Sequence, residues 1–426
     1  MNEADSQRLA SALEQMGYEY SRKIDEADVI VLNTCVVRQS AEDKAYGRLS
    51  SIHPLKKNNP DLVVNLMGCL VGMKTNGVLK ERFPWVDVFS PPSDPAPLIQ
   101  YLRERAGKQL DMDETEKRYA WLDGGAQLPL QDRGKTISAY IPIVYGCSHA
   151  CTFCIIPYRR GVERSRPPQD IVAETHSLVS QGVKEITLLG QIVDRYGKDQ
   201  PEFPGLTGLL RRLHEVEGLE RIRFLTSHPN WMTDELMGAV AELPGLMPHI
   251  EVPVQAGDDQ VLANMRRGYT AQDYRRLVEK LRQRIPGVSI GTDVIVGFPG
   301  ESEHQFQNTF DLLAELKLDV VHLARYSPRA GTVSARSMED DVPDEEKWHR
   351  FRLLEELQKK IAAEIHARYL GSQVTVLFEE KVKTRWKGRT PNNELVFVES
   401  SEDLRGRLEQ VNISWTGPWS MIGEVR

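Results

Sequence analysis

Three cysteines in one short stretch of the sequence, Cys147, Cys151 and Cys154, follow the spacing C-x3-C-x2-C. Thiolates bind iron, and three of them on one loop can hold three irons of a cubane [4Fe-4S] cluster. Because no fourth cysteine lies near in sequence, the fourth iron stays open. An open iron can chelate the amino and carboxyl groups of S-adenosylmethionine and pass it an electron, which splits the sulfonium and yields a carbon radical. The spacing therefore predicts radical chemistry with S-adenosylmethionine.

A zinc site is the alternative for these cysteines, with His149 as the fourth ligand. Structural zinc sites usually combine two pairs of ligands. This group is a single loop after the first expected strand of a βα series, so the iron–sulfur interpretation is favoured.

The composition is that of an ordinary protein with two or three domains: 426 residues, 40% of them hydrophobic and 27% charged. No apolar run reaches the roughly 18 residues of a membrane span, and the N-terminus lacks the features of a secretion signal. Five cysteines are too few and too clustered for a disulfide framework. We therefore expect a cytoplasmic protein without membrane contact. Since the net charge is −7, any nucleic-acid surface must be a local patch.

The first 105 residues alternate helix and strand, which is typical of an α/β sandwich with a parallel sheet. Strands are expected over residues 28–33 and 62–67, and each runs directly into a cysteine, Cys35 and Cys69. Both thiols then lie at the carboxyl edge of the sheet, where open α/β sheets bind ligands. Lone buried cysteines are also common as small core residues, so residue type alone leaves both roles open.

The rest of the chain divides into a linker and two further domains. The linker is expected over residues 106–132, where the sequence is charged and irregular. Residues 133–366 alternate strand and helix six times, which predicts a curved parallel sheet, a partial (βα)6 barrel of TIM type. Residues 367–426 predict a small antiparallel β-barrel, which follows a long charged helix expected over residues 344–367. The expected central strands are 141–145, 185–189, 221–225, 249–254, 289–296 and 320–326.

The phrase GCSHACTFCIIPYRRG around the three cysteines resembles the radical S-adenosylmethionine methylthiotransferase family. Further phrases along nearly the whole chain agree with that family: LLGQ, TSHP, PVQAG with RGYT, and DVIVGFPGE. The likeness is strongest to the MiaB-type tRNA enzymes, which add a methylthio group to carbon 2 of N6-isopentenyladenosine beside the anticodon. The last domain resembles a TRAM domain, a small RNA-binding barrel.

The resemblance implies contacts to S-adenosylmethionine outside the cysteine loop. A flat adenine ring can approach the backbone at a glycine-rich turn, and an arginine can hold the methionine carboxylate with a charge-assisted fork. The alternative is that the matching residues only finish strands and cap helices, and no side chain is assigned a catalytic acid or base role. The implied contacts are Gly190 and Gln191 to the amino group, Gln255 to the ribose, Arg267 to the carboxylate, and Asp293 and Gly297 to the adenine.

The resemblance also implies a second [4Fe-4S] cluster, which three N-terminal cysteines bind in this family. Cys35 in NTC and Cys69 in MGC match the second and third of these ligands. The family's phrase Gly-Cys-Gln-Met-Asn-Glu-Ala-Asp-Ser corresponds here to Met1 through Ser6, so the remaining ligand is absent from this chain. We expect that the start of the chain was assigned too late. The alternative is a compromised second cluster.

Basic residues form a stripe near the C-terminus, at every second position of an expected strand. A period of two puts them on one face, from which they can follow RNA phosphates. A charged edge that prevents aggregation has the same pattern, and the likeness to a TRAM domain favours RNA. A second basic group, Arg159 to Arg166, follows the cysteine loop. The stripe consists of Lys381, Lys383, Arg385, Lys387 and Arg389.

The expected function is radical methylthiolation of carbon 2 of N6-isopentenyladenosine in tRNA, because a C2–H bond is not acidic enough for acid–base catalysis. The base must leave its stacked loop to reach the barrel. tRNA and an electron donor of flavodoxin or ferredoxin type are the expected partners of a monomer. The alternatives are the same chemistry on threonylcarbamoyl-adenosine in tRNA or on a ribosomal-protein aspartate, and an RNA-binding protein with impaired sulfur transfer.

Replacing Cys151 with Ala tests the cluster assignment. We expect anaerobically reconstituted protein to carry an oxygen-sensitive [4Fe-4S] cluster, and Cys151→Ala to lose it because only two thiolates remain on the loop. Iron and sulfide analysis with charge-transfer absorption measures this. Stoichiometric zinc in the purified protein, with no cleavage of S-adenosylmethionine, would contradict the assignment.

Overall fold

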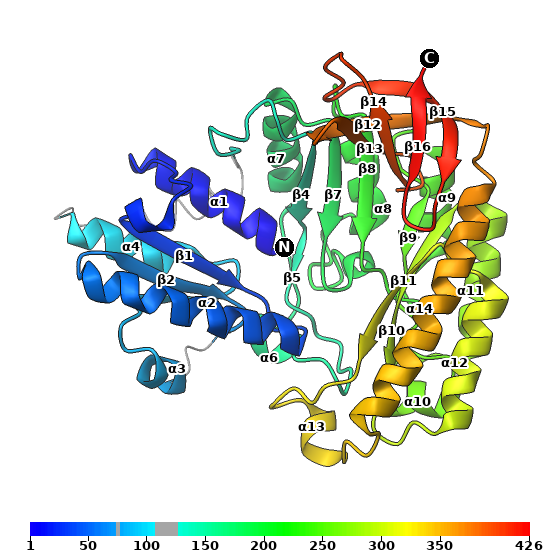
Figure 1. The fold of residues 1–426 in the computed structure, drawn as a ribbon, viewed down its shortest axis with the longest axis horizontal. Helices are drawn as coiled ribbons and strands as arrows, with labels where there is room; N and C mark the ends of the chain where they lie inside the picture. The colour runs from blue at the N-terminus through cyan, green and yellow to red at the C-terminus, as the bar shows by residue number, and fades with distance from the viewer. Residues whose placement is uncertain (74–76, 107–126) are drawn as a thin grey trace.

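The structure is a computed structural model that describes residues 1–73, 77–106 and 127–426. Most of the expected linker, residues 106–132, lies outside the described residues. Along the chain follow an N-terminal sheet with helices, a central half-barrel and a small C-terminal barrel (Figure 1). Within this described portion, no helix is long and apolar enough to cross a membrane.

The N-terminal domain is a parallel three-stranded sheet in the order β1-β2-β3. All residues of β2 are buried because helices cover both faces of the sheet. Leu49 and Ile52 of α2 pack on one face, and Leu9 of α1 with Leu98 of α4 packs on the other. The predicted α/β sandwich is confirmed. The bounds are α1 Asn2–Gln15, β1 Val29–Thr34, α2 Gln39–Asn58, β2 Val63–Gly68, α3 Gly77–Arg82, β3 Val88–Ser90 and α4 Ala96–Arg105.

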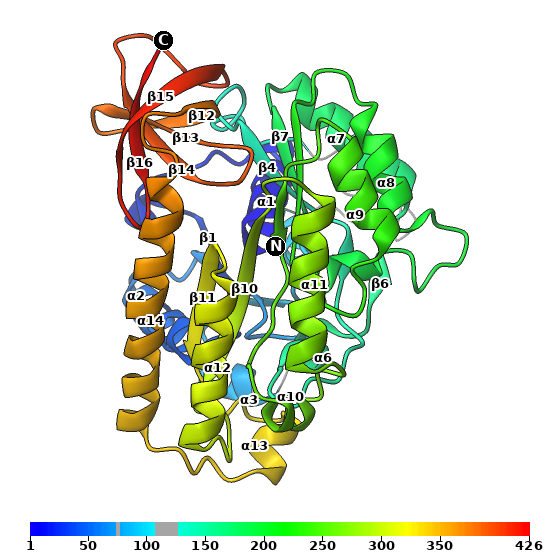
Figure 2. The same ribbon diagram turned by 90° about the vertical axis from the view of Figure 1, so that its right-hand side faces the viewer.

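The central domain holds six parallel strands in two neighbouring sheets, β4-β7-β8 and β11-β10-β9. A parallel bridge from Ile222 to Leu246 connects the end of one sheet with the start of the other. Helices cover the outer face (Figure 2), so the predicted half-barrel is confirmed. The strands are β4 Ser138–Pro142, β7 Glu185–Leu189, β8 Arg221–Leu225, β9 His249–Glu251, β10 Ser289–Val296 and β11 Val320–Arg325, and the covering helices include α7 Pro168–Ser180, α8 Gly205–His214, α9 Asp234–Glu242, α11 Ala271–Arg284 and α12 Glu303–Leu316.

Strand alternation separates a core face from an inner face in this half-barrel. Ile186 and Leu188 of β7 belong to the large core under the helices, whereas Glu185 and Thr187, which alternate with them, line a cavity. The same alternation puts Ile290 and Val294 of β10 in the core. The inner face is therefore polar, which suits a binding site.

The first barrel strand differs from the expected one over residues 141–145. The strand β4 pairs with β7 and ends at Pro142. Val144–Tyr145 instead forms β5, which pairs antiparallel with β6, Arg164–Ser165. The chain changes sheets here, so one apolar run of sequence serves two strands. The cysteine loop lies between β5 and β6.

The C-terminal domain is a closed five-stranded barrel in the order β12-β13-β14-β16-β15, in which β14 and β16 run parallel and the other pairs antiparallel. It follows α14, which spans Asp344–Ala367 as expected. The basic stripe does not lie on one strand, and this expectation was wrong. The chain turns at Lys383, where φ is 56°, so Lys381 lies on β12, whereas Arg385, Lys387 and Arg389 lie on β13. The strands are β12 Gln373–Val382, β13 Arg385–Arg389, β14 Leu395–Glu399, β15 Leu408–Thr416 and β16 Met421–Val425.

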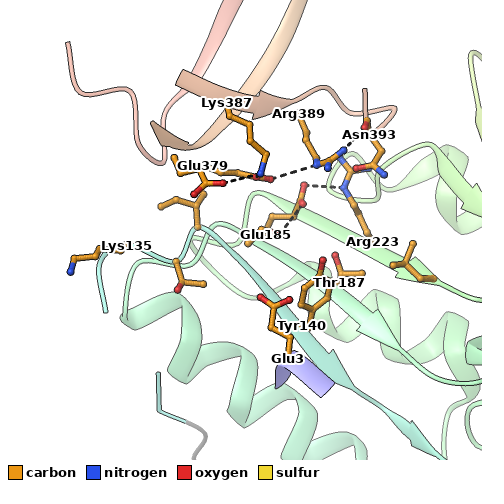
Figure 3. A pocket seen from close by; sticks show the side chains of 15 residues that line it. Glu3, Lys135, Tyr140, Glu185, Thr187, Arg223, Glu379, Lys387, Arg389 and Asn393 are labelled. Atoms are coloured by element: carbon orange, nitrogen blue, oxygen red, sulfur yellow. Dashed lines mark hydrogen bonds and ion pairs between the residues drawn. The ribbon is translucent and has the colours of Figure 1, made fainter. Parts of the chain in front are cut away.

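Two arginines on β8 attach the C-terminal barrel to the half-barrel. Arg223 donates through Nη2 to the Thr390 carbonyl and through Nη1 to the Pro391 carbonyl, both at 2.8 Å. Its Nε donates to Glu185 at 3.0 Å, and Arg221 Nη1 donates to the Arg389 carbonyl at 2.7 Å. A cavity of about 460 Å³ lies beside this contact, between the inner face and β12–β13 (Figure 3).

Replacing Arg223 with Met tests this attachment. The change leaves the buried Glu185 with less compensation and two carbonyls without a donor, so we expect the free energy of unfolding to fall by about 3–5 kcal/mol. Arg276→Met is the matched control, because Arg276 forms an exposed ion pair with Asp273 and should cost at most about 0.5 kcal/mol. Denaturant unfolding measures both. Equal small losses would show that the contact is dispensable.

Candidate active site at the cysteine loop

The cysteine loop is held at three points. Gly146 begins it with φ of 67°, and the Cys147 N–H donates to the Gly161 carbonyl at 3.1 Å. In the middle, the Thr152 N–H donates to the Met265 carbonyl and its hydroxyl to the Asn264 carbonyl. The loop ends in α6, Ile156–Arg160. Backbone contacts therefore fix the cysteines from both sides.

The three thiols lie close enough to influence one another electrostatically. Burial raises the pKa of Cys154 to about 12 and also raises that of Cys147. Arg267 Nη1 donates to Cys151 Sγ at 3.1 Å, which supplies positive charge where a thiolate would bind iron. Within the described ranges, no group of three His, Cys, Asp or Glu side chains is arranged for a single metal ion. The donor set and its arginine fit an iron–sulfur cluster with cysteine ligands.

Two of the predicted cofactor residues, Gln255 and Gln191, have hydrogen bonds that fix their position. Gln255 has φ of 75°, and its backbone bridges to Asp293 and Ile295. Its side-chain Oε1 is buried and has no hydrogen-bond partner. A bound ligand with a donor group would satisfy this acceptor. Gln191 Nε2 donates to Met1 Sδ at 3.3 Å.

Two further predicted cofactor positions, Asp293 and Gly297, are on β10 and in the turn after it. Burial raises the pKa of Asp293, whereas the positive charges of His322 and Arg38 act to lower it. Gly297 has φ of 70°, and a Cβ there would lie 2.3 Å from Lys347 Cγ. The absence of a side chain at Gly297 thus makes room for Lys347 of α14.

Buried polar residues lie beside the loop around His228, to which the sequence assigned no catalytic role. The His228 ring lies 4.7 Å from that of His149, and burial lowers its pKa to about 2. Its backbone N–H donates to the carboxylate of Asp194. Burial raises the pKa of Asp194 to about 7. The hydroxyl of Ser227 is buried without a partner. The phrase TSHP was the only sequence signal for this group.

Cys35 and Cys69 directly follow β1 and β2, as predicted, at the carboxyl edge of the N-terminal sheet. Cys69 is buried, and burial raises its pKa although Arg160 opposes this. Arg160 Nε donates to Cys69 Sγ at 3.2 Å. Since Arg160 ends the helix that follows the cysteine loop, the two cysteine groups are connected through one side chain. Sequence reasoning had no signal for this contact.

The two basic groups are largely engaged within the protein. Lys387 lies 2.9 Å from Glu380 and Arg385 lies 2.9 Å from Glu399. Lys387 and Arg389 line the cavity of Figure 3 and are directed to Glu379. In the loop group, Arg160 contacts the N-terminal domain, and Arg166 donates to Glu174 at 2.6 Å.

Comparisons with known proteins agree with this arrangement. The profile of the Radical SAM superfamily matches residues 141–313, and that of the Uncharacterized protein family UPF0004 matches residues 1–90. A tRNA-2-methylthio-N(6)-dimethylallyladenosine synthase of Roseiflexus sp. (strain RS-1) is 48% identical over 99% of this chain and 87% of its own length. The enzyme of the same name from Herpetosiphon aurantiacus is 43% identical over 100% of this chain and 96% of its own.

The chain belongs to the tRNA-2-methylthio-N(6)-dimethylallyladenosine synthase family. Membership in this family of radical S-adenosylmethionine methylthiotransferases implies a [4Fe-4S] cluster with S-adenosylmethionine, and a second cluster in the N-terminal domain. Among solved structures, the radical S-adenosylmethionine methyltransferase TsrM from Kitasatospora setae has a TM-score of 0.58 at 14% identity, over 90% of this chain and 77% of that chain. That likeness shows the fold alone.

Two glycines test how tightly the cysteine loop is fitted. A Cβ at Gly146 would lie 2.1 Å from the Val162 carbonyl oxygen, whereas a Cβ at Gly134, with a similar φ of 69°, meets nothing within 4 Å. Both Ala variants should lose about 1–2 kcal/mol from the left-handed backbone. Only Gly146→Ala should also lose iron, because the loop must shift. Iron content per chain measures this, and equal iron in both variants would show a tolerant loop.

Proposed function

We propose that this protein transfers a methylthio group to carbon 2 of N6-dimethylallyladenosine in tRNA, with S-adenosylmethionine as methyl donor and radical source. The relatives that carry this function in their names match over nearly the whole chain. The observation that carries the proposal is the contact between Arg160 and Cys69, because it joins the radical cysteine loop to the N-terminal cysteines. A radical site beside a sulfur-bearing site is what methylthiolation needs.

Cys147, Cys151 and Cys154 are the proposed ligands of the radical cluster, which supplies the electron for cleavage of S-adenosylmethionine when bound. Arg267 stabilises the charge on Cys151 through its hydrogen bond. Gln255 offers a buried amide oxygen for a ribose hydroxyl. The remaining proposed cofactor contacts are Gly190, Gln191, Asp293 and Gly297.

Cys35 and Cys69 are the proposed ligands that this chain supplies to the N-terminal cluster. The Arg160 guanidinium beside Cys69 lowers the pKa of that thiol, although burial raises it by more. Within the described residues, these two thiols are the cysteine ligands available in the N-terminal domain. Electrons for both sites would come from a small donor of flavodoxin or ferredoxin type.

The substrate base must leave the stack of neighbouring bases in the tRNA and enter between the domains. His228 cannot serve as a general base there, because burial lowers its pKa to about 2 and leaves the ring a very weak proton acceptor. The C2–H bond is therefore left to the radical. The domain limits we propose for this arrangement are 1–105, 133–366 and 367–426.

The C-terminal barrel would bind the tRNA backbone. Lys381, Lys383 and Arg385 lie around the turn between β12 and β13, where phosphates can reach them. Lys387 and Arg389, which face the cavity, would act closer to the half-barrel.

Three substrates separate the candidate reactions. Reconstituted protein with reductant and S-adenosylmethionine receives a stem-loop RNA with N6-dimethylallyladenosine, the same RNA with threonylcarbamoyl-adenosine, or an aspartate-containing ribosomal peptide. Mass spectrometry should find the methylthio product with the first substrate alone. Product with another substrate would overturn the assignment, and S-adenosylmethionine cleavage without any methylthio product would support a binding protein with impaired sulfur transfer.

A further inference from the structure

Four polar side chains form a relay of contacts across the inner face of the half-barrel. Asn393 Nδ2 lies 3.4 Å from His249 Nε2, which lies 3.3 Å from Glu251 Oε1, and that oxygen lies 3.4 Å from His322 Nε2. We propose that His322, at the end of this relay, holds the purine ring of the substrate nucleotide through a ring nitrogen next to carbon 2. The inference rests on the proposed function and names the side chain that orients its substrate.

Strand register places the members of the relay on the inner face. Gly291 pairs with Glu251, and Asp293 pairs with His322, so these side chains point to one side of the sheet. Ile290 and Val294, which flank Gly291 and Asp293 on β10 and point to the other side, are in the core. A Cβ at Gly291 would lie 2.4 Å from the Glu251 carboxylate. Glycine is therefore needed at position 291 to leave room for the Glu251 carboxylate between the two histidines.

The exposure of the relay rises along its length. The side chains of His249 and Glu251 are 1% and 13% exposed, whereas that of His322 is 50% exposed. His322 is thus the end that a ligand can reach. At the other end, Asn393 lines the cavity of Figure 3.

The charged groups around His322 include one from the N-terminal domain, close in sequence to Cys35. Glu251 of β9 and Asp293 of β10 attract its positive charge, and Arg38 of the N-terminal domain repels it. Arg38 precedes α2 and follows Cys35 by three positions in the chain. A base held at His322 therefore lies between the half-barrel and the loop that carries Cys35.

Protonation decides which hydrogen bonds His322 can make. The Glu251 carboxylate raises the pKa of His322 above its usual value, while the two histidines lower that of Glu251 to about 2. With Nε2 directed to Glu251, protonation makes Nδ1 a donor, whereas the neutral ring offers only an acceptor there. Among the described residues, no group forms a hydrogen bond with Nδ1 of His322, and half of this side chain is exposed.

Adenine is a suitable ligand for such a donor. Carbon 2 lies between N1 and N3, both of which accept hydrogen bonds, and a substituent on N6 leaves both acceptors in place. A charged donor at either nitrogen fixes the ring and withdraws electron density from carbon 2, which favours sulfur transfer to that atom. The donor exists below the raised pKa of His322 and is lost as the pH rises through it.

Deaza analogues in a double-mutant cycle test the inference. The ligands are the N6-dimethylallyladenosine stem-loop RNA and its 1-deaza and 3-deaza forms, each with one ring nitrogen replaced by C–H. Wild-type protein should bind one deaza RNA about tenfold more weakly than the natural RNA, and this loss should vanish at high pH. His322→Phe should bind the natural RNA about tenfold more weakly and show no further loss with that analogue.

His304→Phe is the matched control, because it removes the same ring from the exposed face of α12 and should leave all affinities unchanged. Equal binding of the three RNAs by wild-type protein, at low and high pH, would overturn the inference without any variant. An undiminished deaza loss in His322→Phe would overturn it as well. If wild-type protein still methylthiolates the natural RNA in either case, the proposed function stands and this inference alone fails.

Discussion

A guanidinium taken out of water must find hydrogen-bond acceptors for its N–H groups, and this requirement joins the parts of the protein. Arg8 of α1 donates to both oxygens of Glu174 on α7 at 2.7 Å. Arg160 reaches from the half-barrel to Cys69 and Asn2, and Arg223 reaches from it to the C-terminal barrel. Each contact joins two domains through buried charge, which is costly to break once one partner is lost.

This constraint gives the cysteine loop its place. The loop leaves at β5 and returns at β6, and its last helix is tied to the N-terminal domain through Arg160. On its other side, Arg267 is oriented by Tyr269 and the Pro253 carbonyl while it donates to Cys151. The radical site and the N-terminal cysteines therefore cannot move independently. Sulfur transfer across a domain boundary needs such a fixed arrangement.

Some of the fold could be predicted because the signals are local. The apolar runs of β7 and β10 and the charged periodicity of α14 have the expected bounds. Residue type does not reveal the strand end at Pro142, because one apolar run of sequence forms parts of two strands. It also does not reveal the turn at Lys383, where lysine has the positive φ that usually belongs to glycine. The cysteine spacing marked the candidate site in the same local way. The contact of Arg160 with Cys69 joins residues 91 positions apart, and the order of the chain does not reveal which acceptor a buried arginine finds.

The most direct measurement is nucleoside mass spectrometry of tRNA from a bacterial strain that lacks its own methylthiotransferase and expresses this chain. The account predicts 2-methylthio-N6-dimethylallyladenosine in that tRNA, and a return to N6-dimethylallyladenosine when Cys154→Ala removes a ligand of the radical cluster. Unchanged N6-dimethylallyladenosine in cells that contain the iron-loaded wild-type protein would contradict it.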